Sequence, residues 1–171
     1  KPAGTTALRC GGETRALTVA NALAAMAPEC ADDDWILVHD AARPCVPRDA
    51  LVRLVEQLRD DPVGGLLAIP VADTLKRSDR DADAPRVIAT ESRAHLWLAQ
   101  TPQMFRCGVL RRAITAPSAA TCTDEAQAVE ALGEKPQLIL GSPENLKITY
   151  PADLVLAAAI LSAQHSGEHA P

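Results

Sequence analysis

Aromatic side chains are scarce in this sequence: Phe, Trp and Tyr together make up only 2% of its 171 residues. Lys and Arg are spread along the chain without forming a basic cluster, and the net charge is −5. A nucleic-acid surface needs a basic footprint and usually stacking rings. We therefore expect no nucleic-acid partner.

Long apolar runs are also lacking. A transmembrane helix needs about 20 consecutive apolar residues, and no run in the sequence approaches that length. The first residues do not have the basic and apolar pattern of a secretion signal. We expect no membrane partner and a cytoplasmic location.

The five cysteines lack the spacing of a metal site or of a disulfide framework. They are scattered, none forms a C-x-x-C pair, and their number is odd. Cysteines of this kind are typical of reduced thiols in a reducing compartment. They agree with a cytoplasmic location.

The most informative stretch runs from Trp35 to Pro44 and reads WILVHDAARP. Its apolar first half predicts a short strand buried on both faces, as in the middle of a parallel sheet. Open α/β sheets bind ligands beyond the carboxyl ends of their strands, so we expect Asp40 and Arg43 at a substrate site. The alternative is a plain turn, in which Asp40 bonds to nearby backbone N–H groups and Arg43 is its surface partner.

Strands and helices alternate in the first half of the chain. This order predicts a parallel sheet with right-handed crossovers, and hence a doubly wound, mostly parallel α/β fold in one domain. The Gly11-Gly12 turn before the first helix could offer backbone N–H groups to an anion, or could be an ordinary connection. The strands are expected at 7–10, 35–38 and 64–69, and the helices at 14–27 and 47–60.

The pattern changes at Pro70, where two extended pieces, 71–77 and 86–90, flank a polar segment. A hairpin of this kind cannot form a core of its own. We therefore expect a protruding β-arm over residues 70–93 that packs on a second subunit. Thr74 and Lys76 share one face of its first strand, and a solvated strand face is the alternative for both.

The second half continues with helices and short strands. The apolar stretch 96–105 is expected to turn at its Thr-Pro pair. Thr123 is predicted to cap a helix that runs to Leu132, with acidic residues in its first turn. Further elements are expected at 107–115 (helix), 136–140 and 145–149 (strands), and from Pro151 onward a last helix with Leu154, Val155, Ala158 and Leu161 facing inward.

Lys147 lies beside Thr149 on one face of the strand expected at 145–149. An isolated lysine at a strand end could hold a phosphate group. It could equally be an edge-strand lysine that blocks aggregation. The residues alone leave both interpretations open.

Six motifs follow one another along the chain: GGETRALTV (11–19), VHDAARPC (38–45), PVADTLKR (70–77), ESRAHLWLAQTPQMF (91–105), TDEA (123–126) and NLKIT (145–149). Together they resemble a known family, the 2-C-methyl-D-erythritol 4-phosphate cytidylyltransferases of the non-mevalonate isoprenoid pathway. The motifs stand in the family's order and span nearly the whole chain. The combination of HDAARP, DTLKR and LW-x-AQTPQ-x-F is specific.

The resemblance implies a homodimeric enzyme with a Rossmann-like nucleotidyltransferase fold. Such an enzyme joins CTP to a polyol phosphate, releases pyrophosphate and uses a divalent metal, usually Mg²⁺. One anion attacks another, so positioning and charge neutralisation supply most of the rate and no protein nucleophile is needed. His39 is accordingly expected to be structural.

The resemblance also implies a nucleotide site. Gly11, Gly12 and Thr18 would lie against the cytosine and ribose of CTP. Asp40 and Ala41 would complete this site. Asp40 would in addition bind the metal at the junction of the ribose and the polyol.

A second group of residues would bind the polyol phosphate. Arg43 would lie near the polyol, and Thr74 and Thr123 would line the phosphate pocket. Arg93, carried on the arm, would cross into the neighbouring subunit's site and grip that phosphate. Lys147 would place the phosphate oxygen for attack on the α-phosphorus of CTP, so Arg93 and Lys147 are the expected catalytic residues.

One part of the family pattern has no match in the sequence. Family members open with a strand, a glycine-rich loop with an arginine, and a later lysine, which hold the triphosphate; no G-x-G-x-x-[KR] occurs here. We expect that the sequence covers only part of a longer enzyme, and a true truncation is the alternative. Residues 1–171 alone would lack the triphosphate clamp, and we expect no turnover from them.

The hypothesis is a homodimeric cytidylyltransferase that makes 4-diphosphocytidyl-2-C-methyl-D-erythritol. The nearest alternative is the sister activity on ribitol 5-phosphate, whose enzymes resemble this family closely. An alternative from another class is a non-catalytic nucleotide-binding or dimerisation module, which the unmatched glycine-rich loop suggests.

Overall fold

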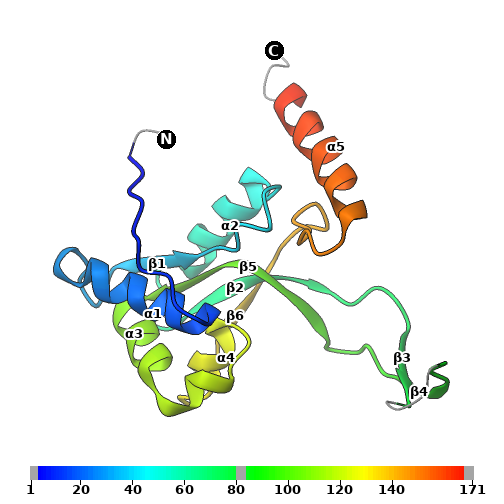
Figure 1. The fold of residues 1–171 in the computed structure, drawn as a ribbon, viewed down its shortest axis with the longest axis horizontal. Coiled ribbons are helices and arrows are strands. Elements are labelled where there is room, and N and C mark those ends of the chain that lie inside the picture. The colour runs from blue at the N-terminus through cyan, green and yellow to red at the C-terminus, as the bar shows by residue number, and fades with distance from the viewer. Residues whose placement is uncertain (1–3, 80–83, 168–171) are drawn as a thin grey trace.

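The structure is a computed structural model that describes residues 4–79 and 84–167. A four-stranded sheet with the order β1-β5-β2-β6 lies at its centre, and helices cover both of its faces (Figure 1). A separate two-stranded sheet, β3-β4, lies at the end of a long protrusion. The chain is therefore a mixed α/β protein.

Most of the predicted elements are confirmed. The exceptions are the strands predicted at 7–10 and 145–149, which are irregular backbone, and the first arm strand, which begins only at Leu75. None of the helices in the described ranges is long and apolar enough to cross a membrane. The elements are α1 Arg15–Met26, η1 Ala27–Glu29, β1 Trp35–Val38, α2 Arg48–Leu58, β2 Gly64–Pro70, β3 Leu75–Ser78, β4 Val87–Glu91, β5 Trp97–Arg106, α3 Cys107–Thr115, η2 Pro117–Thr121, α4 Glu125–Glu130, β6 Gln137–Leu140 and α5 Pro151–Gly167.

The sheet differs from the prediction at β5. The sequence predicts a turn at Thr101-Pro102, but this cis peptide lies inside one continuous strand. β5 runs between β1 and β2 and is antiparallel to both, whereas β2 and β6 pair in parallel. Strands β1, β2 and β6 thus share one direction, as a mostly parallel sheet requires. The predicted parallel pairing of neighbouring strands is nevertheless wrong for two of the three strand pairs in this sheet, because β1–β5 and β2–β5 are antiparallel.

Strand β1 lies at an edge of the described sheet. Its one partner among the described strands is β5, and Leu37 is 44% exposed. The predicted burial of β1 on both faces in the middle of the sheet is therefore wrong. The carboxyl end of β1 nevertheless leads directly into the loop that carries Asp40.

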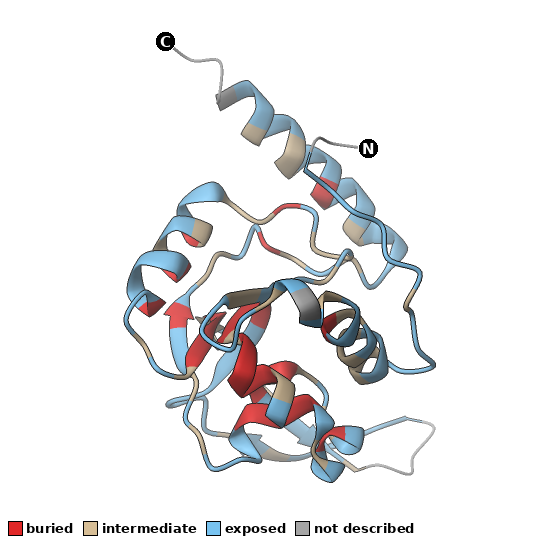
Figure 2. Cartoon of the chain, turned by 90° about the vertical axis from the view of Figure 1, so that its left-hand side faces the viewer, coloured by how far each residue is buried: buried red, intermediate tan, exposed pale blue. Residues whose placement is uncertain are grey.

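Alternate residues of β2 and β5 pack into two separate cores. Leu66 and Phe105 belong to a cluster with residues of α1, α3 and α4, whereas Leu67 and Met104 belong to a cluster with α2. Figure 2 shows the buried residues concentrated on these strands and on the helix faces that cover them. Strands that are buried on both faces are apolar without alternation, which is why the sequence predicts β2 well.

Helix α5 departs most from the expectation. It projects away from the sheet (Figure 1), and Leu154 and Val155 are 58% and 73% exposed. Ala157 on this helix is buried, at 3% exposed. The predicted inward face is therefore wrong for Leu154, Val155 and Ala158. Because α5 is apolar around most of its circumference, its sequence does not indicate which face packs.

We predict that Leu54→Ala lowers the free energy of unfolding by about 2–5 kcal/mol. Leu54 is fully buried between α2 and the sheet, so the substitution removes apolar contacts and leaves a cavity. Val55→Ala on the same helix is the control, because Val55 is 43% exposed, and we expect a change of about 0.5 kcal/mol or less. Urea unfolding followed by circular dichroism measures both, and equal losses would contradict the burial of this helix face.

Candidate functional site

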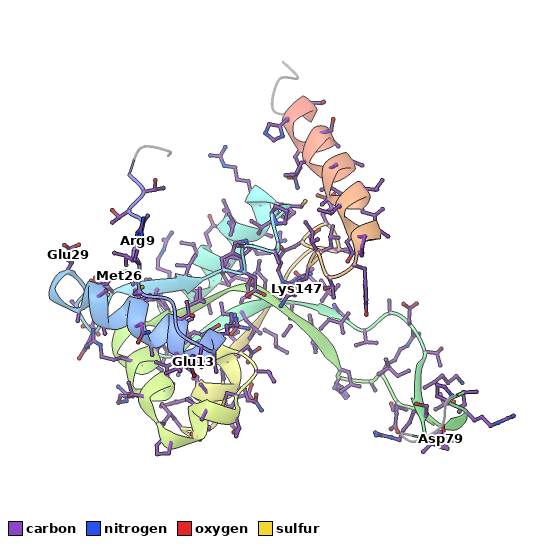
Figure 3. All side chains as sticks on the ribbon, in the orientation of Figure 1. Arg9, Glu13, Met26, Glu29, Asp79 and Lys147 are labelled. Atoms are coloured by element: carbon purple, nitrogen blue, oxygen red, sulfur yellow. The ribbon has the colours of Figure 1, made fainter. Side chains whose placement is uncertain are left out.

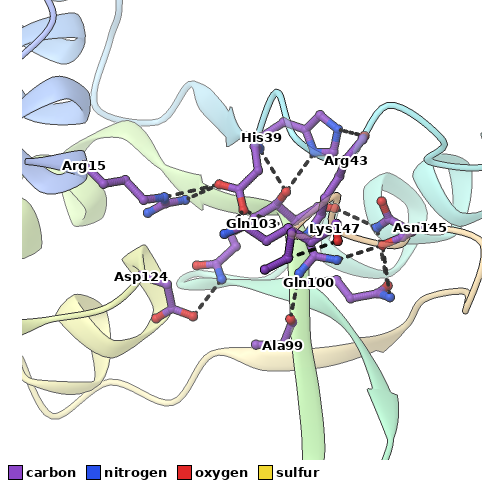
Figure 4. Close-up of polar contacts among 12 residues, drawn as sticks. Arg15, His39, Arg43, Ala99, Gln100, Gln103, Asp124, Asn145 and Lys147 are labelled. Atoms are coloured by element: carbon purple, nitrogen blue, oxygen red, sulfur yellow. Dashed lines mark hydrogen bonds and ion pairs between the residues drawn. The ribbon is translucent and has the colours of Figure 1, made fainter. Parts of the chain in front are cut away.

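Three cationic side chains surround Asp40 at the carboxyl end of β1, and Figure 4 labels these three, Arg15, Arg43 and Lys147. Arg15 Nη2 lies 3.2 Å from Asp40 Oδ1, while Lys147 Nζ lies 3.2 Å and Arg43 Nε 3.8 Å from Oδ2. These cations come from α1, from the segment between β6 and α5, and from the loop after β1. Asp40 is therefore more than a turn residue, because charges from distant parts of the chain converge on its carboxylate.

The cations decide the ionisation of Asp40. Burial alone raises the pKa of its carboxyl, but the hydrogen bond from Lys147 and the charges of Arg15 and Lys147 outweigh burial. The pKa of Asp40 therefore lies below its ordinary value, and the group is an anion at neutral pH. Burial lowers the pKa of the Arg43 guanidinium, although Asp40 acts in the opposite direction. Arginine stays charged at neutral pH, so three cations face the carboxylate of Asp40, and the carboxylate of Glu125 offsets part of their charge through Arg15.

His39 holds the Asp40 loop in place. Its ring nitrogens lie 2.9 Å from the Arg43 carbonyl oxygen and 2.9 Å from Thr101 Oγ1. Thr101 Oγ1 also accepts the backbone N–H of Asp40 at 3.0 Å. All three contacts are satisfied when the Thr101 hydroxyl donates to Nδ1 and Nε2–H donates to the carbonyl oxygen. The prediction that His39 is structural agrees with these contacts.

Buried amide side chains fix the segment that carries Lys147. Asn145 is fully buried, and its Nδ2 donates to the carbonyl oxygen of Thr101 at 2.8 Å. The carbonyl oxygen of Asn145 accepts from Arg43 Nη1 at 2.7 Å, and Gln100 Nε2 donates to the segment at Ser142 O. Because this segment is not a strand, the interpretation of Lys147 as an edge-strand guard is wrong.

Two cavities meet at this cluster. The α4-side cavity has a volume of about 170 Å³ and is lined in part by Arg43 and Thr123. The α1-side cavity has a volume of about 320 Å³ and is lined in part by Thr18 and Ala41. Three charged residues line both cavities, namely Arg15, Asp40 and Lys147. Two ligands in these cavities would face each other across the three charges.

Gly11 and Gly12 stand just before α1 and do not line either cavity as the described residues form them. Gly12 connects to the site through its N–H, which donates to Thr18 Oγ1 at 3.0 Å. A Cβ at Gly12 would come within 2.6 Å of Leu17 Cβ. The close approach of this turn to the first turn of α1 therefore requires glycine.

Thr74 and Arg93 lie on the arm and are both exposed. The structure does not bring them to the cluster around Asp40. In Figure 3 the arm reaches away from Lys147 and ends near Asp79. Within one chain, the predicted arm residues and the predicted body residues are thus separate.

The prediction that Thr123 caps α4 is wrong. The N-cap is Asp124, whose side chain accepts the backbone N–H of Gln127 at 2.8 Å. Thr123 instead contacts Gln127 Oε1 through its own N–H and hydroxyl. Both Thr and Asp are favoured at this position, so the Thr-Asp pair alone does not decide between them.

Sequence reasoning missed Arg15 as a site residue. Its guanidinium bonds both to Asp40 and, at 2.5 and 2.8 Å, to the two carboxylate oxygens of Glu125. One signal was available, because Arg15 is a cation in the first turn of a helix, where the helix dipole disfavours positive charge. A cation in that position indicates a specific anionic partner.

Two carboxylates, those of Asp40 and Asp124, line the cavities and are candidate donors for a magnesium ion. No group of three or more His, Cys, Asp or Glu side chains in the described part of the chain could hold a metal. Magnesium, however, keeps several waters and is commonly bound by one or two carboxylates together with substrate phosphates. The ionised Asp40 carboxylate, which faces both cavities, fits that kind of site.

Comparisons with known proteins point to one family. The 2-C-methyl-D-erythritol 4-phosphate cytidylyltransferase family model matches residues 4–163. The enzyme of this name from Thiobacillus denitrificans is 57% identical over 160 residues, which cover 93% of this chain and 68% of the relative. The one from Dechloromonas aromatica is 58% identical over 157 residues, with 92% and 67% covered. The chain thus spans about two thirds of the length of these relatives.

Solved structures agree with the sequence relatives. A crystal structure of a 4-diphosphocytidyl-2C-methyl-D-erythritol synthase matches with a TM-score of 0.80 and 50% identity, covering 88% of this chain and 68% of that one. The 2-C-methyl-D-erythritol 4-phosphate cytidylyltransferase of Francisella tularensis matches with a TM-score of 0.78 and 40% identity, covering 88% and 69%.

We predict that Lys147→Met raises the pKa of Asp40 in the free protein. The substitution removes a hydrogen bond and a positive charge that favour the carboxylate, so the protonated form becomes easier to populate. An NMR titration of the Asp40 carboxyl carbon measures the change. Lys135→Met removes the same charge from an exposed position outside both cavities and is expected to leave this pKa unchanged. An unchanged pKa in Lys147→Met would contradict the ion pair.

Proposed function

Because the chain belongs to the 2-C-methyl-D-erythritol 4-phosphate cytidylyltransferase family, we propose that the cluster around Asp40 binds both substrates of that reaction. The reaction joins CTP to 2-C-methyl-D-erythritol 4-phosphate and gives 4-diphosphocytidyl-2-C-methyl-D-erythritol and pyrophosphate. The names of relatives at 55–58% identity favour this function over ribitol 5-phosphate transfer and over a non-catalytic module. One observation carries the site proposal: three cations hold one carboxylate between two cavities.

CTP occupies the α1-side cavity in this proposal. Thr18 and Ala41 line that cavity and supply hydroxyl and backbone groups to the nucleoside. Gly11 and Gly12 lie next to Thr18 and leave room for the base to approach the backbone. Asp40 accepts a hydrogen bond from the ribose at the border between the cavities.

The polyol phosphate occupies the α4-side cavity. Arg43 and Thr123 line it and contact the polyol and its phosphate. Lys147 lines both cavities, so its ammonium can bind the attacking phosphate oxygen and place it next to the α-phosphorus of CTP. A phosphate oxygen forms the new P–O bond while the bond to the pyrophosphate group breaks.

The chain's own charges supply the main catalytic effect. Attack of a phosphate on a triphosphate brings two anions together, and cations fixed at the border lower the repulsion between them. Arg43 and Lys147 are held in position by Asp40 and by the buried Asn145. A magnesium ion bound by Asp40 would neutralise further charge on the phosphates when it is present.

We propose that the active form is a homodimer in which the arm of one subunit completes the site of the other. The arm strands β3 and β4 pair with each other and with no other described strand. Val87 and Ile88 on β4 are both 62% exposed, and an isolated hairpin is marginally stable. A second subunit would cover this surface and would receive Thr74 and Arg93. The five free cysteines support a cytoplasmic location.

A pyrophosphate-release assay tests the proposed function. The full-length enzyme is incubated with CTP, Mg²⁺ and either 2-C-methyl-D-erythritol 4-phosphate or ribitol 5-phosphate. We expect pyrophosphate release when CTP and 2-C-methyl-D-erythritol 4-phosphate are both present. The kcat/KM for this compound should be higher than that for ribitol 5-phosphate. No release with that compound, or a preference for ribitol 5-phosphate, would overturn the proposal.

We predict that Lys147→Ala lowers kcat by about 10²–10³-fold, because a charge placed at the reacting phosphates is lost. CTP affinity should change little, since most contacts of the nucleoside lie on Thr18 and the Asp40 loop. Steady-state kinetics and calorimetry with CTP measure the two effects. Lys135→Ala is the control for loss of one positive charge. Unchanged turnover in Lys147→Ala would contradict its role.

We predict that Arg93 acts across the dimer. Arg93→Ala should raise the KM for the polyol phosphate far more than that for CTP. When Arg93→Ala and Lys147→Ala subunits are mixed and reassembled, each heterodimer has one site with both side chains intact, so activity should recover to about a quarter of the wild-type value. No recovery would mean that Arg93 acts within its own chain or only stabilises the arm.

A further inference from the structure

Glu125 is a buried charged residue that lines neither of the two cavities. It lies on α4 and is 2% exposed, and it is not among the residues that line the α1-side or the α4-side cavity. Burying a carboxylate is unfavourable unless the group is paired. Its place in the fold therefore depends on a partner.

The partner is Arg15 on α1. Arg15 Nη1 and Nη2 donate to the two oxygens of Glu125 at 2.5 and 2.8 Å, which is the two-pronged geometry that makes arginine–carboxylate pairs strong and directional. The remaining nitrogen, Nε, donates to Asp40 Oδ1 at 3.2 Å. One guanidinium thus joins a buried anion to the carboxylate at the centre of the site.

The residues on either side of Glu125 are held in place by hydrogen bonds to the sheet. Gln103 on β5 accepts the backbone N–H of Ala126 at 2.8 Å and donates to Asp124 at 2.9 Å, so both residues next to Glu125 are tied to the sheet. Val129, one turn further along α4, is fully buried in the core. A carboxylate on so rigid a support can fix the side chain of Arg15, which is 35% exposed even with this pair formed.

Arg15 is the point at which this support reaches the substrates. It lines both cavities, and guanidinium groups bind phosphate oxygens well. Without Glu125, the Arg15 side chain would lose two of its three bonds to the protein and could turn into solvent. If the Arg15–Glu125 salt bridge served only to join α1 to α4, the additional bond from Arg15 to Asp40 would not be needed.

We propose that Glu125 is a positioning residue for the cytidylyl transfer. Its buried carboxylate holds the Arg15 guanidinium against Asp40, where Arg15 faces the phosphate groups of the substrates. This inference rests on the proposed function for the identity of those substrates. Glu125 on α4 thus contributes to the reaction indirectly, by holding Arg15 in position.

The test is a double-mutant cycle. Glu125→Gln keeps the shape of the side chain and should lower kcat/KM by about 10- to 100-fold, because a displaced binding group costs that much. Arg15→Gln should lower it at least as much, and adding Glu125→Gln to Arg15→Gln should have no further effect. Glu130→Gln, at an exposed position of the same helix, is the control and should keep full activity.

Unchanged activity in Glu125→Gln, or an equal additional loss in the Arg15→Gln background, would overturn the proposal. Glu125→Gln could also fail to fold, so Arg15→Met with Glu125→Leu provides a second variant that replaces both partners by apolar groups. We expect it to fold and to have the low activity of Arg15→Gln. Full activity in this variant would show that the pair only stabilises the fold.

Calorimetric titration with CTP keeps this test separate from that of the reaction. Because Arg15 lines the α1-side cavity, Arg15→Gln should weaken CTP binding at least as much as Glu125→Gln does, and adding Glu125→Gln to Arg15→Gln should cause no further loss. If the wild-type enzyme releases no pyrophosphate, the proposed function fails, while a loss of CTP affinity in Glu125→Gln that disappears in the Arg15→Gln background still supports the link from Glu125 to Arg15. Additive losses of CTP affinity would count against that link whatever the outcome of the assay.

Discussion

The carboxylate of Asp40 is the point on which the charged site depends. Two of the three cations within 4 Å of it, Arg15 and Lys147, come from segments far away in the sequence. Without this anion, three positive charges would repel one another at the border of the two cavities. The same carboxylate thus assembles the binding groups, and because Glu125 also pairs with Arg15, the three cations and two carboxylates leave one positive charge in excess. That excess is what a reaction between two anionic substrates needs.

The sheet gives this cluster its rigidity. β5 lies between β1 and β2 and carries Gln100, Thr101 and Gln103, which bond to the Asn145 segment, to the Asp40 loop and to α4 respectively. Both faces of β2 and β5 are covered by helices. One central strand therefore positions three of the segments that surround the cavities, and α1 lines them as a further segment. Its polar side chains are buried because each has found a partner.

The sequence predicts some of these features well and misses others for physical reasons. Asp40 and Arg43 are predictable, because a short apolar strand followed at once by charged residues marks a strand end. Arg15 is not, since Glu125 lies 110 residues away and a local pattern carries no information about such a pair. The place of β5 between two parallel strands is missed for the same reason, because periodicity gives burial and not neighbours. In the local pattern Lys147 is only an isolated lysine, and the family resemblance alone marks it as catalytic. Its contact with Asp40 depends on an irregular segment that side chains hold in place.

The central claim is that the two substrates meet across Asp40, with the nucleoside on the α1 side and the polyol on the α4 side. The most direct test is a crystal structure of the full-length enzyme bound to 4-diphosphocytidyl-2-C-methyl-D-erythritol, which contains both halves in one molecule. We expect the cytidine beside Thr18 and Ala41, the methylerythritol beside Arg43 and Thr123, and the diphosphate next to Lys147. A product bound in the reverse sense, or entirely on one side of Asp40, would contradict the claim.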